Sequence, residues 1–130
     1  MKKFWLFLAS AAMLTTSALS EPLPSSAKKA TLDEFKKFAD GKEVSVVIFD
    51  AGVPVTATLI WNWKKKGITG NALVDGQKVK VKAKLSFKDD KACSTAGGKT
   101  NCHAIAIDGN KFYEVRDDGD VHAVSELIDG

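Results

Sequence analysis

The feature that most constrains this chain is a run of strict alternation from residue 78 to residue 88. Apolar side chains occupy every second position from Val79 to Phe87, and lysines or a serine fill the positions between them. A repeat of two residues is typical of a β-strand with one buried side and one solvent-facing side. A polar, glycine-containing loop follows, and then the mainly apolar run 102–107. We therefore expect a β-hairpin in this part of the chain.

The only two cysteines of the chain, Cys93 and Cys102, stand at the two ends of that loop. Two cysteines in an exported protein are typical of one disulfide. A pair of metal-binding or redox-active thiols is the alternative, but the spacing fits neither C-x-x-C nor C-x-x-C-H. We predict a structural disulfide that closes the loop of the hairpin.

The N-terminus has the pattern of a signal peptide. Lys2 and Lys3 precede an apolar run over residues 4–14, and the small residues Ala18 and Ser20 follow. This pattern predicts a bacterial Sec-type signal peptide over residues 1–20 and a periplasmic or secreted protein. A membrane anchor is the alternative, but a spanning helix needs about 20 apolar residues, roughly twice the length of this run. We expect no transmembrane segment after signal removal.

The remaining residues, 21–130, are enough for one modest core. Loss of Lys2 and Lys3 lowers the net charge from +3 to about +1. Nine lysines oppose three aspartates over residues 64–91, whereas two cations oppose seven acids over residues 108–130. This asymmetry predicts a basic face and an acidic face, or simply two solvated surfaces. An exported, nearly neutral chain without an aromatic-interleaved basic platform does not favour nucleic acid as a partner.

The first ordered element expected after the signal peptide is a short helix. Residues 21–30 are rich in proline, serine and lysine and predict a flexible leader. Thr31 and Glu34 fit a capping box, and Gly41 is typical of a helix end. One apolar face is expected to dock on the sheet, formed by Leu32, Phe35, Phe38 and Ala39.

About seven strands follow, joined mostly by short turns of the Asp-Gly type. They are expected at residues 43–50, 55–63, 68–74, 78–88, 102–107, 111–116 and 121–127. Successive strands with tight turns pair antiparallel with their neighbours. We predict a mainly β (α+β) fold over residues 31–130, in which an antiparallel meander forms a barrel or half-barrel and the helix covers one opening or edge. A two-sheet sandwich is the competing layout.

Tryptophans beside lysines are the candidate ligand contacts. Trp61 and Trp63 lie on the same side of their strand as Leu59, either in the core or at the mouth of a cavity next to a lysine rim. Tryptophan at such a border suits a small amphipathic or anionic ligand. The lysines of the alternating strand could extend this rim or protect a sheet edge. The predicted ligand-binding residues are Trp61, Trp63, Lys64, Lys65, Lys66, Lys78, Lys80, Lys82 and Lys84.

Signatures of catalysis are missing from the sequence. It contains neither G-x-S-x-G nor a P-loop. His103 and His122 could bind a metal with acids such as Asp108 or Asp120 if their strands adjoin, but H-E-x-x-H and H-x-H spacings are absent. The acidic run 117–120 lacks EF-hand spacing and fits a turn. We expect no catalytic residues, no metal and no cofactor.

The layout as a whole resembles a known type of protein. A capped helix (Thr31 to Phe35), the pair Gly41-Lys42, an antiparallel meander with two cysteines, and the turns Asp108-Gly109 and Asp118-Gly119 follow one another. This order resembles small exported bacterial proteins of lipocalin-like or half-barrel type. The size, disulfide use and β content are also similar to those of small exported lysozyme inhibitors.

Two functions are consistent with these features. The first is an exported, non-enzymatic binding protein for an amphipathic or anionic ligand of the cell envelope. The second is a protein–protein module, such as a hydrolase inhibitor or an envelope-assembly partner.

Overall fold

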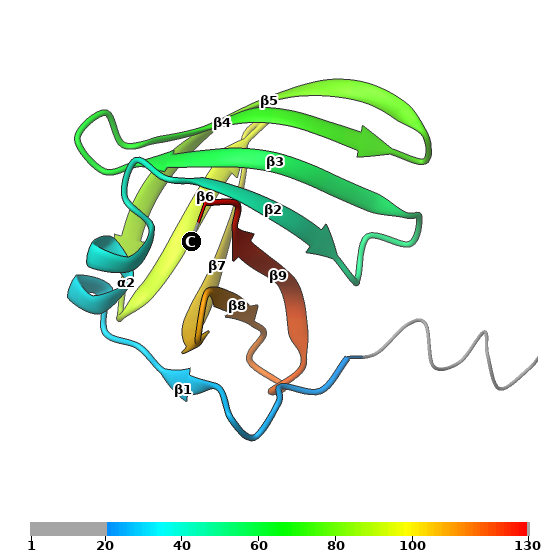
Figure 1. Cartoon of the computed structure of the whole chain (residues 1–130). Coiled ribbons are helices and arrows are strands. Elements are labelled where there is room, and N and C mark those ends of the chain that lie inside the picture. The colour runs from blue at the N-terminus through cyan, green and yellow to red at the C-terminus, as the bar shows by residue number, and fades with distance from the viewer. Residues whose placement is uncertain (1–20, 130) are drawn as a thin grey trace, which may run out of the picture.

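The computed structural model describes residues 21–129, so the predicted signal peptide and Gly130 lie outside the described residues. The described chain forms a closed antiparallel barrel of eight strands, with one additional short strand and one short helix (Figure 1). In chain order the elements are β1 (Lys28–Lys29), α2 (Leu32–Ala39), β2 (Glu43–Ile48), β3 (Val55–Asn62), β4 (Gly67–Val74), β5 (Gln77–Lys88), β6 (Lys91–Ala96), β7 (Lys99–Asp108), β8 (Lys111–Val115) and β9 (Val121–Leu127).

The barrel closes by pairing its first strand with its last. Each strand from β2 to β9 pairs antiparallel with the next one along the chain, and β9 then pairs with β2, with Val46 opposite Ser125. A closed sheet leaves few free strand edges, which is one way in which β-proteins avoid aggregation. The prediction of a mainly β fold is confirmed, and the sheet is a closed barrel.

The predicted count of seven strands is wrong, because residues 91–96 form β6 within the segment that the sequence assigned to a loop. β6 pairs with β5 on one side and with β7 on the other. Two-residue turns with positive φ flank it: Asp89 and Asp90 before it, at 50° and 63°, and Gly97 and Gly98 after it, at 59° and 77°. The Gly-Gly pair is a hairpin signal. The sequence of β6, Lys-Ala-Cys-Ser-Thr-Ala, conceals the strand because it shows no apolar alternation.

The predicted disulfide between Cys93 and Cys102 is confirmed, although its surroundings differ from the expectation. The two cysteines face each other on the paired strands β6 and β7, with their Cα atoms 4.0 Å apart. The bond therefore links two strands of one hairpin and does not close an irregular loop. A disulfide is compatible with an oxidising compartment.

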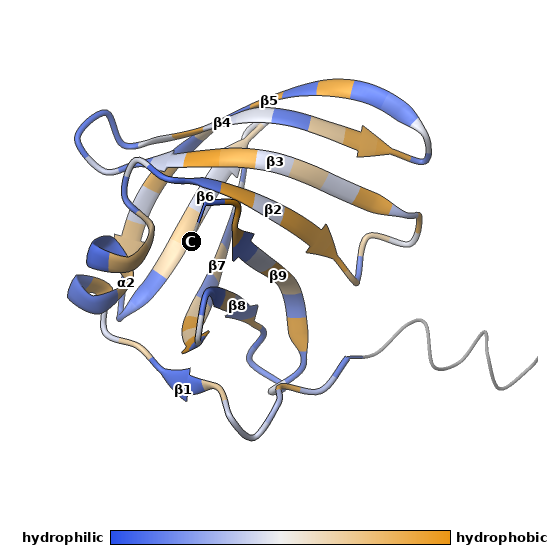
Figure 2. Ribbon diagram, in the orientation of Figure 1, coloured by the Kyte–Doolittle hydropathy of each residue, from blue (hydrophilic) through white to orange (hydrophobic). Residues whose placement is uncertain are grey.

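Helix α2 begins and ends as predicted and packs into one end of the barrel. The Glu34 amide donates to Thr31 Oγ1 at 3.1 Å, and the Thr31 amide donates to Glu34 Oε1 at 2.8 Å, which completes the capping box. The hydrophobic side of the helix faces the strands, and its hydrophilic side faces outward (Figure 2). The fully buried Phe35 makes edge-to-face contacts with Trp61, Trp63 and Phe112, at centroid distances of 5.2, 5.0 and 4.8 Å.

Residues 21–30 pack along the barrel, which differs from the flexible leader that their composition predicts. Lys28 and Lys29 form β1 on β7, and the Ala30 amide donates to the Ile105 carbonyl at 2.9 Å. Two apolar side chains of this segment pack beside Tyr113 in a second hydrophobic cluster. Those side chains are Leu23 and Ala27. These contacts cover an apolar patch on the barrel wall.

β4 approaches β3 closely at Gly70, which pairs with Leu59. A Cβ atom at this position would lie 2.0 Å from the Thr58 carbonyl oxygen and 2.9 Å from the Leu59 Cα. Both neighbours are backbone atoms of the paired strand, so neither can move aside cheaply. The close approach of the two strands therefore requires glycine here.

We predict that Gly70→Ala lowers the free energy of unfolding by at least about 2 kcal/mol, because the added methyl group overpacks two backbones. Chemical denaturation followed by circular dichroism measures the change. Gly67→Ala, on the same strand, is the matched control, since its Cβ would meet the Ala83 carbonyl oxygen at an ordinary 3.7 Å. Equal stability of the two variants would contradict the close approach at Gly70.

Candidate functional site

The lysines of β5 lie on the outer face of the barrel, in register with polar side chains of three neighbouring strands. On β2, β3 and β4, the residues between these polar positions point to the opposite side of the sheet, and Val46, Trp61 and Ile68 among them are buried. Two adjacent rows of directly paired residues run around the outside: Lys78, Leu73, Thr56 and Val47 in the first, and Lys80, Asn71, Thr58 and Ser45 in the second.

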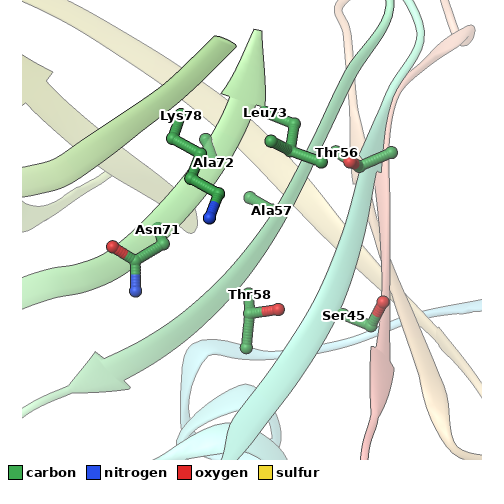
Figure 3. A pocket seen from close by; sticks show the side chains of 8 residues that line it. All are labelled: Ser45, Thr56, Ala57, Thr58, Asn71, Ala72, Leu73 and Lys78. Carbon is green, nitrogen blue, oxygen red and sulfur yellow. The ribbon is translucent and has the colours of Figure 1, made fainter. Parts of the chain in front are cut away.

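These rows border a hollow of about 560 Å³ on the outer wall (Figure 3). Asn71 and Lys78 lie on one side of the hollow, and Thr58 and Ser45 lie on the other (Figure 3). The remaining lining residues are Thr56, Ala57, Ala72 and Leu73. The hollow thus offers hydroxyl, amide and ammonium groups, together with one exposed apolar side chain, Leu73, at 44% exposure.

The other predicted lysines continue this surface toward the helix end of the barrel. Lys82 and Lys84 are exposed and pair with Thr69 and Gly67 of β4. The turn between β3 and β4, residues 64–66, is exposed as well, and its last carbonyl accepts a hydrogen bond from the Leu85 amide at 2.8 Å. All seven predicted lysines therefore lie on one connected surface, which we call the lysine face: Lys64, Lys65, Lys66, Lys78, Lys80, Lys82 and Lys84.

The same register supports a structural role for part of the lysine face. β5 pairs with β4 over residues 77–84, but it pairs with β6 only over residues 84–88. Within residues 21–129, one edge of β5 from Gln77 to Ala83 therefore has no strand partner. Lysines on an open edge hinder pairing with other chains. Protection of this edge and recognition of a ligand are compatible roles.

The two predicted tryptophans lie on the inner side of the barrel, away from the hollow. Trp61 is 3% exposed in the main core, and Trp63 stacks on Phe87 at 5.7 Å. The Trp61 indole N–H is buried, and no acceptor for it lies among the described residues. Because α2 and Phe35 cover both rings, we leave Trp61 and Trp63 out of the candidate binding surface.

A second polar site lies on the inner side of the barrel, formed by His103, Glu114 and His122. We call these three residues the His–Glu–His cluster. The two imidazole rings stack with centroids 4.3 Å apart and planes 5° from parallel. Glu114 Oε2 lies 3.7 Å from His103 Nδ1. One ligand atom from each residue lies within 4.8 Å of the others.

The sequence prediction named the wrong acids as possible partners of these histidines. Asp108 accepts a hydrogen bond from Ser26, and Asp120 lies 3.8 Å from Arg116. The sequence does not single out Glu114, because alternation along a short strand does not show which residues of other strands its side chain contacts. One signal was available, since Glu114 and the buried Phe112 have the same parity on one strand and hence face the same side.

Burial disfavours charge within the cluster. The side chains of His103 and Glu114 are only 13% and 14% exposed. Burial raises the pKa of Glu114 to about 7, opposed by His122 and reinforced by Asp50. Burial, followed by the nearby His122, lowers the pKa of His103 to about 4. Both groups are therefore shifted toward their neutral forms.

Ion pairs flank the cluster. Asp50 Oδ1 lies 2.6 Å from His122 Nδ1, and its other oxygen lies 3.4 Å from Arg116. Arg116 also pairs with Asp118, and Lys91 pairs with Asp117 at 2.8 Å. The acidic run 117–120 thus forms a turn, as the sequence predicts. In the structure its carboxylates also face cations.

Comparisons with known proteins identify no relative. No protein-family model matches the chain, and neither the curated proteins nor the solved structures contain a significant match. The resemblance to lipocalin-like proteins and to lysozyme inhibitors therefore stays a prediction. Over residues 21–129, no helix has the length and apolar character needed to cross a membrane.

We predict that Glu114→Gln is more stable than the wild-type protein at neutral and higher pH. Below pH 4.5 the carboxyl is neutral in both states, so Glu and Gln behave alike. As pH rises from 4.5 through about 7, the unfolded chain releases its proton before the folded chain does, and the wild type loses stability. The full difference is on the order of 3 kcal/mol. Urea denaturation with a metal chelator at pH 4, 6 and 8 measures it; a constant difference between variants would contradict this burial effect.

Proposed function

We propose that this protein is an exported, non-enzymatic binding protein that holds an acidic glycan of the cell envelope on the outer wall of its barrel. One observation carries the proposal: the hollow between β2 and β5 combines hydroxyl, amide and ammonium groups and adjoins the lysine face. The proposal keeps the anionic, envelope-associated ligand that the sequence suggests and moves it from the tryptophans to this surface.

The side chains of the hollow match the groups of an acidic sugar. Thr58, Ser45 and Asn71 can exchange hydrogen bonds with sugar hydroxyls. The apolar face of a sugar ring can pack on Leu73 and on Val47, which is 40% exposed. Lys78 can pair with a carboxylate or sulfate group, and such charged hydrogen bonds are stronger than neutral ones.

Regular spacing of the lysines favours a polymer over a compact anion. Lys78, Lys80, Lys82 and Lys84 stand at every second position of one strand, so their ammonium groups recur along its length. A strand rises about 3.3 Å per residue, which places successive lysines about 7 Å apart. An oligosaccharide with an acidic group on several rings can contact more than one of them.

A protein partner is the second candidate function. The open edge of β5, with Val79 at 45% exposure beside the lysines, favours it, because an exposed edge can accept an extended acidic segment as an extra strand. An inhibitor of a hydrolase or an envelope-assembly partner would use this edge.

We predict that the Lys78→Glu/Lys80→Glu variant binds acidic oligosaccharides at least about tenfold more weakly than the wild type, because it loses charged hydrogen bonds at the hollow. Calorimetric titration with oligogalacturonate and a sulfated heparin hexasaccharide measures the affinity, with neutral cellohexaose as the reference ligand. Intrinsic tryptophan fluorescence is a poor probe here because Trp61 is buried.

Lys36→Glu/Lys37→Glu, on the exposed side of α2, carries the same charge change and is the matched control. We expect its affinity to stay within about twofold of the wild type at 150 mM salt, because these two lysines do not line the hollow and salt screens exposed charges. Equal losses in the two variants, or no binding of any acidic oligosaccharide, would contradict the glycan proposal. Capture of a stoichiometric protein that is lost in Lys78→Glu/Lys80→Glu would favour the second candidate.

A further inference from the structure

We propose that His103, Glu114 and His122 form a binding site for one divalent transition-metal ion of the Zn²⁺ class, on the inner side of the barrel. Two imidazoles and one carboxylate form a common donor set for zinc and related ions. The site is separate from the lysine face, so the metal proposal can be tested independently of the glycan proposal. It departs from the sequence-based expectation of no metal.

Adjacent strands bring the three donors together. His103 is on β7, Glu114 on β8 and His122 on β9, and β8 pairs with both of the other strands. Glu114 lies opposite Ile105 on β7 and opposite Ala123 on β9, both of which are core residues. The carboxylate therefore points to the inner side of the barrel.

An irregularity in β9 brings the second histidine to the same side. Glu114 pairs with Ala123, but the next residue, Val115, pairs with Val121, so His122 is an extra residue in the ladder. In regular pairing, His122 would face away from Ala123 and Glu114. The register shift allows its ring to stack on His103 instead. β-Bulges often redirect side chains at functional sites. The bulge therefore supports a bound ligand on grounds other than the chemistry of the three side chains.

Asp50 orients His122 as a metal ligand. Its Oδ1 lies 2.6 Å from His122 Nδ1, which fits a proton on Nδ1 and a free lone pair on Nε2. Metal-bound histidines commonly donate their second ring N–H to a carboxylate in this way. Arg116 Nη1, 3.4 Å from Asp50 Oδ2, holds that carboxylate in place.

The distances permit coordination after small side-chain movements. Zn–N and Zn–O bonds are about 2.0–2.2 Å long, so donor atoms around one tetrahedral ion lie about 3.4 Å apart. The ligand atoms of the cluster lie within 4.8 Å of one another. Because the two rings are stacked in parallel, one imidazole must rotate about its Cβ–Cγ bond for both nitrogens to point at the same ion.

The donor set favours a cation at this position. Metal binding requires neutral imidazole and an ionised carboxylate, and the negative charge of that carboxylate would offset part of the charge of the ion. Three protein ligands also leave a fourth coordination position for water or for a ligand from solution.

Isothermal titration of the untagged protein with ZnCl₂, after treatment with a chelator, tests the site. We expect one Zn²⁺ ion per chain in the wild type. Glu114→Gln should weaken binding at least about 100-fold, and Asp50→Asn, which removes the orienting carboxylate, should weaken it about 10- to 100-fold. Glu114→Gln is suited to this test because we expect the variant to remain folded.

Glu126→Gln is the matched control, because this glutamate lies on β9 but is exposed and bonds Asn110. Its affinity should stay within about twofold of the wild type. Long-range ¹H–¹⁵N spectra of the wild type give a second readout, in which Zn²⁺ should shift the ring nitrogens of both histidines. No binding by the wild type, binding that leaves both rings unshifted, or equal losses in Glu114→Gln and Glu126→Gln would overturn the proposal.

Discussion

The structure depends on the pairing of β2 with β9, which turns a meander into a barrel. Every other pairing between barrel strands joins neighbours in sequence, whereas this one joins residues 44–48 to residues 123–127. It closes the core around Phe35 and Phe112, and it brings Asp50, just beyond the end of β2, to His122 on β9. Closing so long a loop costs conformational entropy, which the apolar residues buried on the inner face must offset.

A single layer of sheet then separates two chemically different surfaces. Alternation along each strand sends one set of side chains inward and the next set outward. On β5, the lysines face out while Leu85 is buried. On β8, by contrast, the inward-facing side chains include an ionisable one, Glu114, two positions after Phe112. The proposed glycan surface therefore lies on the outer side of the sheet, and the proposed ion site lies on the inner side.

Local patterns in the sequence were sufficient for most of the fold. The helix was predictable because Thr31 and Glu34 cap it through nearby atoms, and β5 was predictable because its lysines alternate strictly with apolar residues. β6 was hidden because alanine, cysteine, serine and threonine give no periodic signal. Residues 21–30 pack against distant partners such as Tyr113, and composition does not reveal such contacts.

The candidate sites were predictable only in part, because contacts between distant segments leave no local pattern in the sequence. The lysines were identified because they lie on the exposed side of an obvious strand, and their cross-strand neighbours followed only once the register was known. Trp61 and Trp63 are candidate ligand contacts in the sequence because three lysines follow them, but α2 packs over both rings. The His–Glu–His cluster needed both the strand order and the irregularity at His122, neither of which leaves a motif in the sequence.

The register between β2 and β9 is the most direct test of this account, because a slip of one residue would exchange the inner and outer faces of β9 relative to its partner. Nuclear Overhauser contacts between backbone protons of the two strands measure it. In the closed barrel we expect contacts for the facing pairs Val46–Ser125 and Ile48–Ala123. The absence of contacts between these strands, or contacts shifted by one residue, would contradict a barrel closed in this way.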